Sequence, residues 1–487
     1  MKKINSIAAL VFLAFFLFGW VSSAKAEIRL IGDELIMNGF LRSQVGLNVG
    51  NKNPVLKDKL DYILLRTLLQ AELSYKPIDV VNFYTKIRAI NNSTEKVNNL
   101  DPGYDAYPTK FDNDWTLSRV SNDNNALEAW ELYTNLKLGE NLWLRLGRQQ
   151  VVWGEMVGQR ILDIVNPLDL SWHMFWEPEE FENARIPVWA IRGGYSIPNR
   201  FIKELTLEGV INPGDVVPSQ LPPTGSPLTL FVLPSFLRVT DDNVPRGNWE
   251  YGGRITGMIS QVRFSLVYFS QYSDGGITTS YGIIPDPVNG IPLLAPVSFT
   301  RYSILEKTDY PRINSYGGSF DWYWEAAKTV INGELVYTRD FPYNSSKSTS
   351  AIENKGTAKW GIKLTRPTSV LPDGFDFAAL SIQFIETYRE GNSDDILISN
   401  GPADKQEDAV TVSITQAFDH QQVEASFLYT YDLDDAYWFR SYLKVKRGNN
   451  WVFQVGNNMF GGAKNDSGRF GASHWANEVY GRITYQF

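Results

Sequence analysis

Segments in which apolar and polar side chains alternate recur from about Leu35 to the end of the chain, and they constrain the fold more than any other feature. In the first segment, Leu41 and Val45 fall on one face, whereas Arg42 and Gln44 fall on the other. Successive side chains of a β-strand point to opposite faces of the sheet, so this period predicts strands with one apolar and one polar face. No long segment with the helical period interrupts the series. The chain is therefore expected to be all-β.

Segment and connection lengths distinguish a membrane barrel from a β-sandwich, which also alternates. The segments reach about ten residues or more, as a tilted strand needs to cross a bilayer. Tight turns are expected near 76–79, 139–141, 198–202, 260, 325–327, 419–420 and 447–449. Longer connections are expected near 92–125, 151–185, 213–247, 273–309, 342–356, 391–407 and 461–473. Short periplasmic turns and long extracellular loops are typical of outer-membrane proteins, so we predict a single transmembrane antiparallel up-and-down β-barrel of about 18 strands (16–18).

The start of the chain has the layout of a secretory signal peptide. Lys2 and Lys3 precede an apolar run from Ile7 to Val21, and a small-residue A-x-A motif ends at Ala26. A single membrane anchor would need a longer apolar run without a cleavage motif directly after it. We therefore expect residues 1–26 to be a cleaved signal peptide of a Gram-negative bacterium, and residues 27–487 to form the barrel in its outer membrane.

The final segment also alternates and ends in an aromatic residue. Val479, Ile483, Tyr485 and the terminal Phe487 share one face, with Arg482 on the other. An aromatic last residue on an alternating strand resembles the signal that the barrel assembly machinery reads. Tyr485 and Phe487 are therefore the expected assembly signal, and that machinery is an expected partner.

Composition supports this interpretation and narrows the partners. Mean hydropathy is −0.23, yet 14% of the residues are aromatic, as the girdles of a membrane barrel require. The absence of cysteine excludes disulfides, thiol nucleophiles and covalently attached haem. A formal net charge of −8, more negative without the signal, makes nucleic acid and anionic lipid surfaces poor partners. Outer-membrane lipid and lipopolysaccharide are expected partners because the chain is expected to be an outer-membrane barrel.

One stretch, LRLGRQQVVWGE at 144–155, is followed by IVNPLDLS at 164–171. It resembles a Gram-negative outer-membrane family catalogued as domain of unknown function 1302, whose members carry GRQ-V-x-WGE and then I-N-P-x-D. This chain departs from that pattern by extra spacing before Trp153 and by Val165 before Asn166. The resemblance implies a porin-like barrel that handles hydrophobic or aromatic organic compounds.

The long connection at 151–185 is the expected constriction of the pore. Its aromatic cluster would lie in water if the loop stayed outside, so folding into the lumen would bury the rings. The alternative is that the rings pack within an extracellular loop or against lipopolysaccharide. The candidate pore residues are Arg145, Arg148, Trp153, Glu155, Asn166, Asp169, Trp172 and Trp176, with Arg148 or Arg185 as partners of the loop acids.

The alternation also assigns charged side chains to the lumen. These are Arg42, Arg66, Glu72, Lys86, Arg88, Glu131, Lys137, Arg145, Arg192, Arg254, Glu334, Arg440 and Lys444. Their basic excess would attract anions and orient polar solutes. The alternative is that they only pair across neighbouring strands.

The leading functional hypothesis is an outer-membrane channel or facilitated transporter for small organic solutes, without cofactor or metal. Catalysis is not expected, because the three histidines, His173, His420 and His474, have no evident orienting partner in sequence. Acidic clusters lack the spacing of a calcium loop. Two other classes stay open: a barrel that sheathes a partner such as a multihaem cytochrome, and a surface receptor or adhesin.

Overall fold

The computed structural model describes residues 28–98 except 51–52, 54, 57 and 59; 119–156 except 123–124; 160–170; 181–220; 227; 237–292 except 286–290; 301–368; 378–462 except 399–400, 403 and 434; 470; and 473–487. No helix in these ranges is long and apolar enough to span a membrane.

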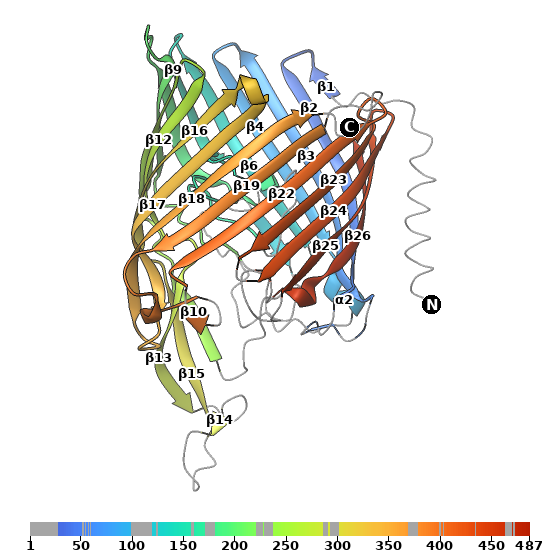
Figure 1. Ribbon diagram of the computed structural model, residues 1–487. Helices are drawn as coiled ribbons and strands as arrows, with labels where there is room; N and C mark the ends of the chain where they lie inside the picture. The colour runs from blue at the N-terminus through green and yellow to red at the C-terminus, as the bar shows by residue number, and fades with distance from the viewer. Residues whose placement is uncertain are drawn as a thin grey trace.

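Eighteen antiparallel strands form a closed barrel (Figure 1), and the prediction of an all-β barrel of this size is confirmed. Each strand pairs with the next in the series, and β26 pairs with β2 to close the ring. The strands are β2 (Leu35–Asn48), β3 (Tyr62–Ile78), β4 (Val81–Asn92), β6 (Asn125–Leu138), β7 (Leu142–Gln149), β8 (Val188–Ser196), β9 (Lys203–Asn212), β11 (Glu250–Ile259), β12 (Val262–Tyr272), β16 (Arg312–Trp324), β17 (Thr329–Ser345), β18 (Ile352–Thr368), β19 (Ala378–Arg389), β22 (Gln406–Phe418), β23 (Val423–Asp432), β24 (Ala436–Arg447), β25 (Trp451–Gly462) and β26 (Glu478–Gln486).

The two faces of the barrel differ as the alternation predicts. On β17, Leu335 is 49% exposed on the outer face while its neighbour Glu334 is 6% exposed. On β12, Leu266 is 59% exposed while Ser265 is 6% exposed. An apolar outside is stable only against lipid, so these faces place the barrel in the outer membrane.

Outward-facing aromatic side chains gather near the short turns. Tyr75 stacks on Phe83 beside the turn between β3 and β4, and Trp322 stacks on Trp324 beside the turn between β16 and β17, each pair with ring centroids 6.2 Å apart. Such rings suit the boundary between hydrocarbon and headgroups, where one end of the side chain is apolar and the other wet.

Several connections contain structure that alternation alone did not predict. Within the long connections near 213–247 and 273–309, β10 (Leu237–Asn243), β13 (Ile277–Pro285), β14 (Ile291–Pro292) and β15 (Arg301–Asp309) form a second sheet. Figure 1 shows it projecting from the barrel at the end opposite the C-terminus. Its parallel β10–β15 pair joins two different loops, a long-range pairing that local sequence does not encode.

The loop pattern is also less regular than expected. The connection between β23 and β24, at 433–435, is short although it lies on the long-loop side, and 369–377 is a connection on the turn side that the sequence did not reveal. Smaller elements flank the barrel: β1 (Ile28–Ile31), β5 (Arg119–Asn122), β20 (Ile396–Ile398), β21 (Gly401–Pro402), α2 (Thr94–Asn98) and α3 (Phe181–Ala184), with the 3-10 turns η3 (Glu325–Ala327), η4 (Ser393–Asp395) and η5 (His474–Ala476).

The closing seam depends on close contact between Gly39 and the last residue. The backbone groups of Gly39 and Phe487 exchange two hydrogen bonds of 2.9 Å. A Cβ at Gly39 would lie 2.3 Å from the Gln70 carbonyl oxygen and 2.7 Å from the Phe487 ring. Only glycine fits here without displacing backbone.

We therefore expect Gly39→Ala to lower the heat-unfolding midpoint of the folded barrel, at a cost of about 1–3 kcal/mol for overpacking. The measurement is the temperature at which gel mobility shifts from the folded to the unfolded form. Gly481→Ala on the partner strand is the matched control, because its Cβ would meet nothing within 4 Å. Equal midpoints for the two variants would contradict the role of Gly39.

Candidate functional site

The chain between β7 and β8 packs against side chains on the inner face of the wall. Residues 150–156 and 160–170, termed the 150–170 segment, contribute Val151, Trp153, Ile161, Leu162 and Val165 to one apolar cluster. The wall contributes inward-facing residues of several strands to the same cluster: Val188, Ala190, Val210, Val267, Phe269, Val336 and Ile385. The segment is thus held to the β8–β19 side of the barrel by buried apolar area.

Two glycines of the wall create recesses for this segment. A Cβ at Gly317 would lie 2.5 Å from Leu162 Cδ2, and a Cβ at Gly361 would lie 3.0 Å from Ile161 Cδ1. Larger residues at these positions would push the segment away from β16 and β18. The recesses therefore determine where Ile161 and Leu162 sit.

Glu334 is the polar anchor of the segment. Its carboxylate accepts backbone N–H groups from Glu155 and from Leu162, the latter at 3.1 Å. Lys363 on β18 donates to the Glu155 carbonyl oxygen at 2.9 Å. A carboxylate that accepts two amides satisfies backbone donors which the segment, having left the sheet, cannot pair itself.

Trp153 connects the segment to a second charged group. Its indole N–H donates to Glu208 Oε1 at 2.8 Å, and its ring meets Phe269 edge-on with centroids 5.7 Å apart. The Glu208 carboxylate also accepts hydrogen bonds from Arg192 and Arg254, each at 3.0 Å. The sequence prediction omitted Glu208, although the alternation of Leu207, Glu208 and Gly209 would have assigned it to the inner face.

Asn166 holds the two ends of the segment together. It is fully buried, accepts the Val151 N–H at 2.7 Å, and donates to the carbonyls of Ile186 at 2.8 Å and Gln149 at 3.4 Å. Its side chain therefore joins the end of β7 to the start of β8.

Charged side chains also hold the 150–170 segment in place. Arg185 donates to Asp163 at 2.6 Å, with both side chains buried. Arg160 donates to the carbonyls of Asp163 and Asn166 and lies 3.6 Å from Asp274. Arg160 and Asp163 were not among the predicted residues, because no strand alternation covers this segment.

The remaining candidates occupy distinct positions. Arg148 is buried and donates to the Trp130 carbonyl at 3.1 Å, and Asp169 bridges to Gln220 of the next loop. The Glu155 side chain is exposed. Trp172 and Trp176 lie outside the described residues.

Arg145 is separate from the segment, on the wall beside Asn135. Several predicted lumen charges pair across strands, as the alternative interpretation held. Lys86 lies 3.5 Å from both Glu72 and Glu131, and Arg88 Nε lies 2.9 Å from Glu128.

Asp215 lies in the loop after β9 and is partly buried beside the segment. Burial raises the pKa of this carboxyl above its ordinary value, against the opposing effects of the Trp189 N–H that it accepts at 2.9 Å and of the Arg148 charge. The folded protein therefore binds a proton at Asp215 more readily than the unfolded chain does.

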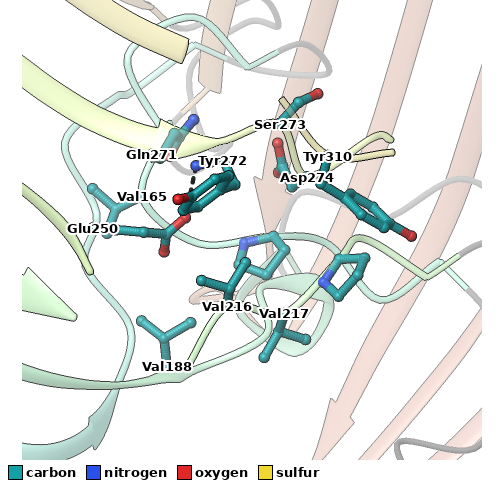
Figure 2. Close-up of a pocket in the computed structure, with 12 residues that line it drawn as sticks. Val165, Val188, Val216, Val217, Glu250, Gln271, Tyr272, Ser273, Asp274 and Tyr310 are labelled. Carbon is teal, nitrogen blue, oxygen red and sulfur yellow. Dashed lines mark hydrogen bonds between the residues drawn. The ribbon is translucent and has the colours of Figure 1, made fainter. Parts of the chain in front are cut away.

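The 150–170 segment and the neighbouring loop pack closely and leave only a small cavity between them. Figure 2 shows Val165 of the segment, Val188 of β8 and Val216 and Val217 of the loop around a cavity that Glu250 also lines. The cavity has a volume of about 10 Å³, room for roughly one water. A cavity of this size has no room for an organic solute.

A closed eighteen-stranded barrel with an apolar exterior and a charged interior defines a porin-like outer-membrane protein. A family model described as "Protein of unknown function (DUF1302)" matches residues 33–487, and the chain belongs to that family. The resemblance inferred from the GRQ and Asn-Pro motifs is thus confirmed.

Solved structures that match include Acinetobacter baumannii OccAB3, at 11% identity and TM-score 0.49, over 93% of this chain and 99% of that one. Pseudomonas aeruginosa OccK8 (OprE) matches at 8% identity and TM-score 0.49, over 93% and 98%. Salmonella typhi OmpF in complex with daunomycin matches at 10% identity and TM-score 0.43, over 95% and 100%. No curated protein matches the chain in sequence.

Removal of the Asn166 side chain should loosen the segment. Asn166→Ala leaves buried backbone groups of Val151 and Ile186 without partners, each at a cost of about 1–3 kcal/mol. We expect faster protease cleavage within 150–187 of the folded barrel, measured by limited proteolysis and mass analysis. Asn248→Ala, which removes one exposed side-chain hydrogen bond to Pro245, is the control. Unchanged cleavage in the Asn166 variant would show that the segment is held without it.

Asp215→Asn should change how stability depends on pH. The raised pKa means that the ionised carboxylate destabilises the fold at neutral pH, and that protonation relieves this cost as pH falls through the raised pKa. The amide keeps an acceptor for Trp189 but carries no charge. We expect the heat-unfolding midpoint of the variant to exceed that of the parent at neutral pH, with the difference shrinking in acid. A lower midpoint at neutral pH would contradict this sign.

Proposed function

We propose that this protein is an outer-membrane diffusion channel for small organic solutes, with the 151–185 loop as its constriction. A barrel of eighteen strands is too wide for its own side chains to fill. The proposal rests on one observation above all: Glu334 accepts two backbone N–H groups of the 150–170 segment on the inner face of the wall. A segment held there narrows the water-filled path.

The lining supports passage of polar or partly aromatic solutes. Inward-facing strand positions carry charges of both signs, such as Arg254 and Glu208. Aromatic side chains lie beside some of them: Tyr133 is under Arg145, and Tyr442 donates to Glu424. Charges orient a solute while the rings offer it an apolar face. The proposed solute class is small organic compounds, among them the hydrophobic or aromatic ones that the family resemblance implies.

The proposal assigns no catalysis to the chain. His420 is 95% exposed in a turn, 3.6 Å from Asp419, where nothing excludes water. Acid–base work by histidine requires an oriented, partly enclosed imidazole. A channel needs neither, and its work is done by the shape and charge of the lumen.

The decisive measurement is single-channel conductance of the refolded barrel in a planar bilayer. The parent should give a steady ohmic current. Replacing 151–185 by a short Gly-Ser linker should raise the conductance, because the constriction is gone. Glu334→Gln removes the carboxylate that holds Glu155 and Leu162, so we expect a noisier current and a higher mean conductance.

Glu424→Gln is the matched control for the Glu334 variant. Glu424 is also an inward-facing carboxylate, but it pairs with Lys444 at 2.7 Å on β24. It should alter ion selectivity while leaving the mean conductance and noise unchanged. Equal currents from the parent, the loop deletion and Glu334→Gln would refute the constriction. Silence from parent and deletion alike, with the barrel shown to be folded, would favour a barrel that sheathes a partner or serves as a receptor.

A further inference from the structure

A second cavity lies on the inner wall, beside the turn between β3 and β4. Its volume is about 370 Å³, within the range of roughly 300–1,000 Å³ typical of small-molecule sites. Its polar lining comes from four neighbouring strands and the turn: Asp79, Asn82, Asn135, Lys137, Arg145 and Arg192, together with Trp143. It meets the contacts of the 150–170 segment through Arg192, whose partner Glu208 also accepts the Trp153 indole N–H.

Two arginines oppose each other in this cavity. Arg145 and Arg192 are directly paired in the register of β7 and β8. Like charges at directly opposite positions destabilise a sheet. Arg145 Nε donates to the neutral Asn135 oxygen at 2.7 Å. Among the described residues, no carboxylate forms an ion pair with Arg145 or Lys137.

The acids nearby are already engaged. Asp79, at the edge of the cavity, pairs with Lys76 at 2.8 Å. Glu208 is shared between Arg192 and Arg254, so one carboxylate balances two guanidinium groups. The cavity therefore keeps a net positive charge, and an anion bound there would relieve the repulsion between its arginines.

The same cavity contains a flat aromatic surface. Trp143 lies across Gly194, where a Cβ would come within 2.5 Å of the indole Nε1. The Arg192 guanidinium is 5.3 Å from the Trp143 ring centroid, and Arg145 is 4.1 Å from that of Tyr133. These contacts restrain the guanidinium planes beside an indole that lines the cavity.

From this geometry we propose that the cavity is a binding site for small aromatic carboxylates. The carboxylate lies between Arg145 and Arg192, where guanidinium groups form paired charge-assisted hydrogen bonds. The charge of Lys137 attracts the ligand carboxylate at longer range, and the ring of the ligand packs on Trp143. As a station on the solute path, the site rests on the proposed channel function; as an equilibrium binding site, it does not.

The test is isothermal titration of the folded, detergent-solubilised barrel with benzoate, which requires no conduction. Benzoate should bind, whereas benzamide, of the same shape without charge, should bind at least about tenfold more weakly because it loses the charge-assisted bonds. Inorganic phosphate and acetate report the contribution of charge alone and should bind more weakly than benzoate. Benzoate binding no tighter than benzamide, or no tighter than acetate, would overturn the proposal.

Variants separate the two halves of the site. Arg145→Gln and Lys137→Gln should weaken benzoate, the first by about tenfold or more. Trp143→Leu should reduce benzoate affinity toward that of acetate and leave acetate unchanged. Arg42→Gln removes the same charge from β2, outside the cavity, and should bind benzoate like the parent. Equal losses in the Arg145 and Arg42 variants would show that only the overall lumen charge matters, which would refute a defined site.

Conductance distinguishes this inference from the proposed function. Benzoate that binds in the titration and reduces the single-channel current, in the parent but not in Arg145→Gln, supports both. A conducting channel without benzoate binding overturns the site and leaves the channel. Binding by a barrel that never conducts supports the site and refutes the channel.

Discussion

Closure of the hydrogen-bonded ring between β2 and β26 is the constraint on which the rest of the structure depends. Within lipid, a strand cannot leave backbone donors or acceptors unpaired, so a sheet survives there only without edges. Here the ring closes over nine residue pairs, from Phe40–Gln486 to Asn48–Glu478. Once it is closed, alternation sends apolar side chains outward to lipid and polar side chains inward. The large strand number then creates a lumen that the wall alone cannot fill.

The 150–170 segment packs against the inner wall, and its backbone N–H and C=O groups must also be paired although it has no neighbouring strand. The segment has left the sheet, and side chains replace the missing ladder: Glu334 and Asn166 take the N–H groups of Glu155, Leu162 and Val151. Apolar packing supplies the rest of the attachment, with glycines on the wall leaving room for it. Buried polar side chains that are fully hydrogen-bonded specify one position of the segment. Any shift of the segment would break several hydrogen bonds at once and leave buried polar groups unpaired.

Charge is distributed unevenly around the lumen. Near β4 and β6, acids and bases pair directly, as Lys86 does with Glu72 and Glu131. A bulge on β6 places both Trp130 and Glu131 on the buried side, which makes the Glu131 contact possible. Between β7 and β11 bases outnumber their partners, so the wall there retains positive charge. Pairing, one of the two alternatives posed from sequence, is thus observed near β4 and β6, while attraction of anions stays a proposal for the wall between β7 and β11.

The sequence by itself determined the class of fold, the strand number to within about two, and the face of many strand residues, because lipid outside and water inside impose a period of two that is visible locally. It also marked the stretch around Trp153 and Asn166 as unusual. Only the tertiary structure decided the partners: Glu208 with Trp153, Glu334 with Leu162, and the β10–β15 sheet formed by two loops. In each of these contacts, strand register, glycine recesses and barrel closure bring together residues that are far apart along the chain. No local sequence pattern predicts such long-range proximity.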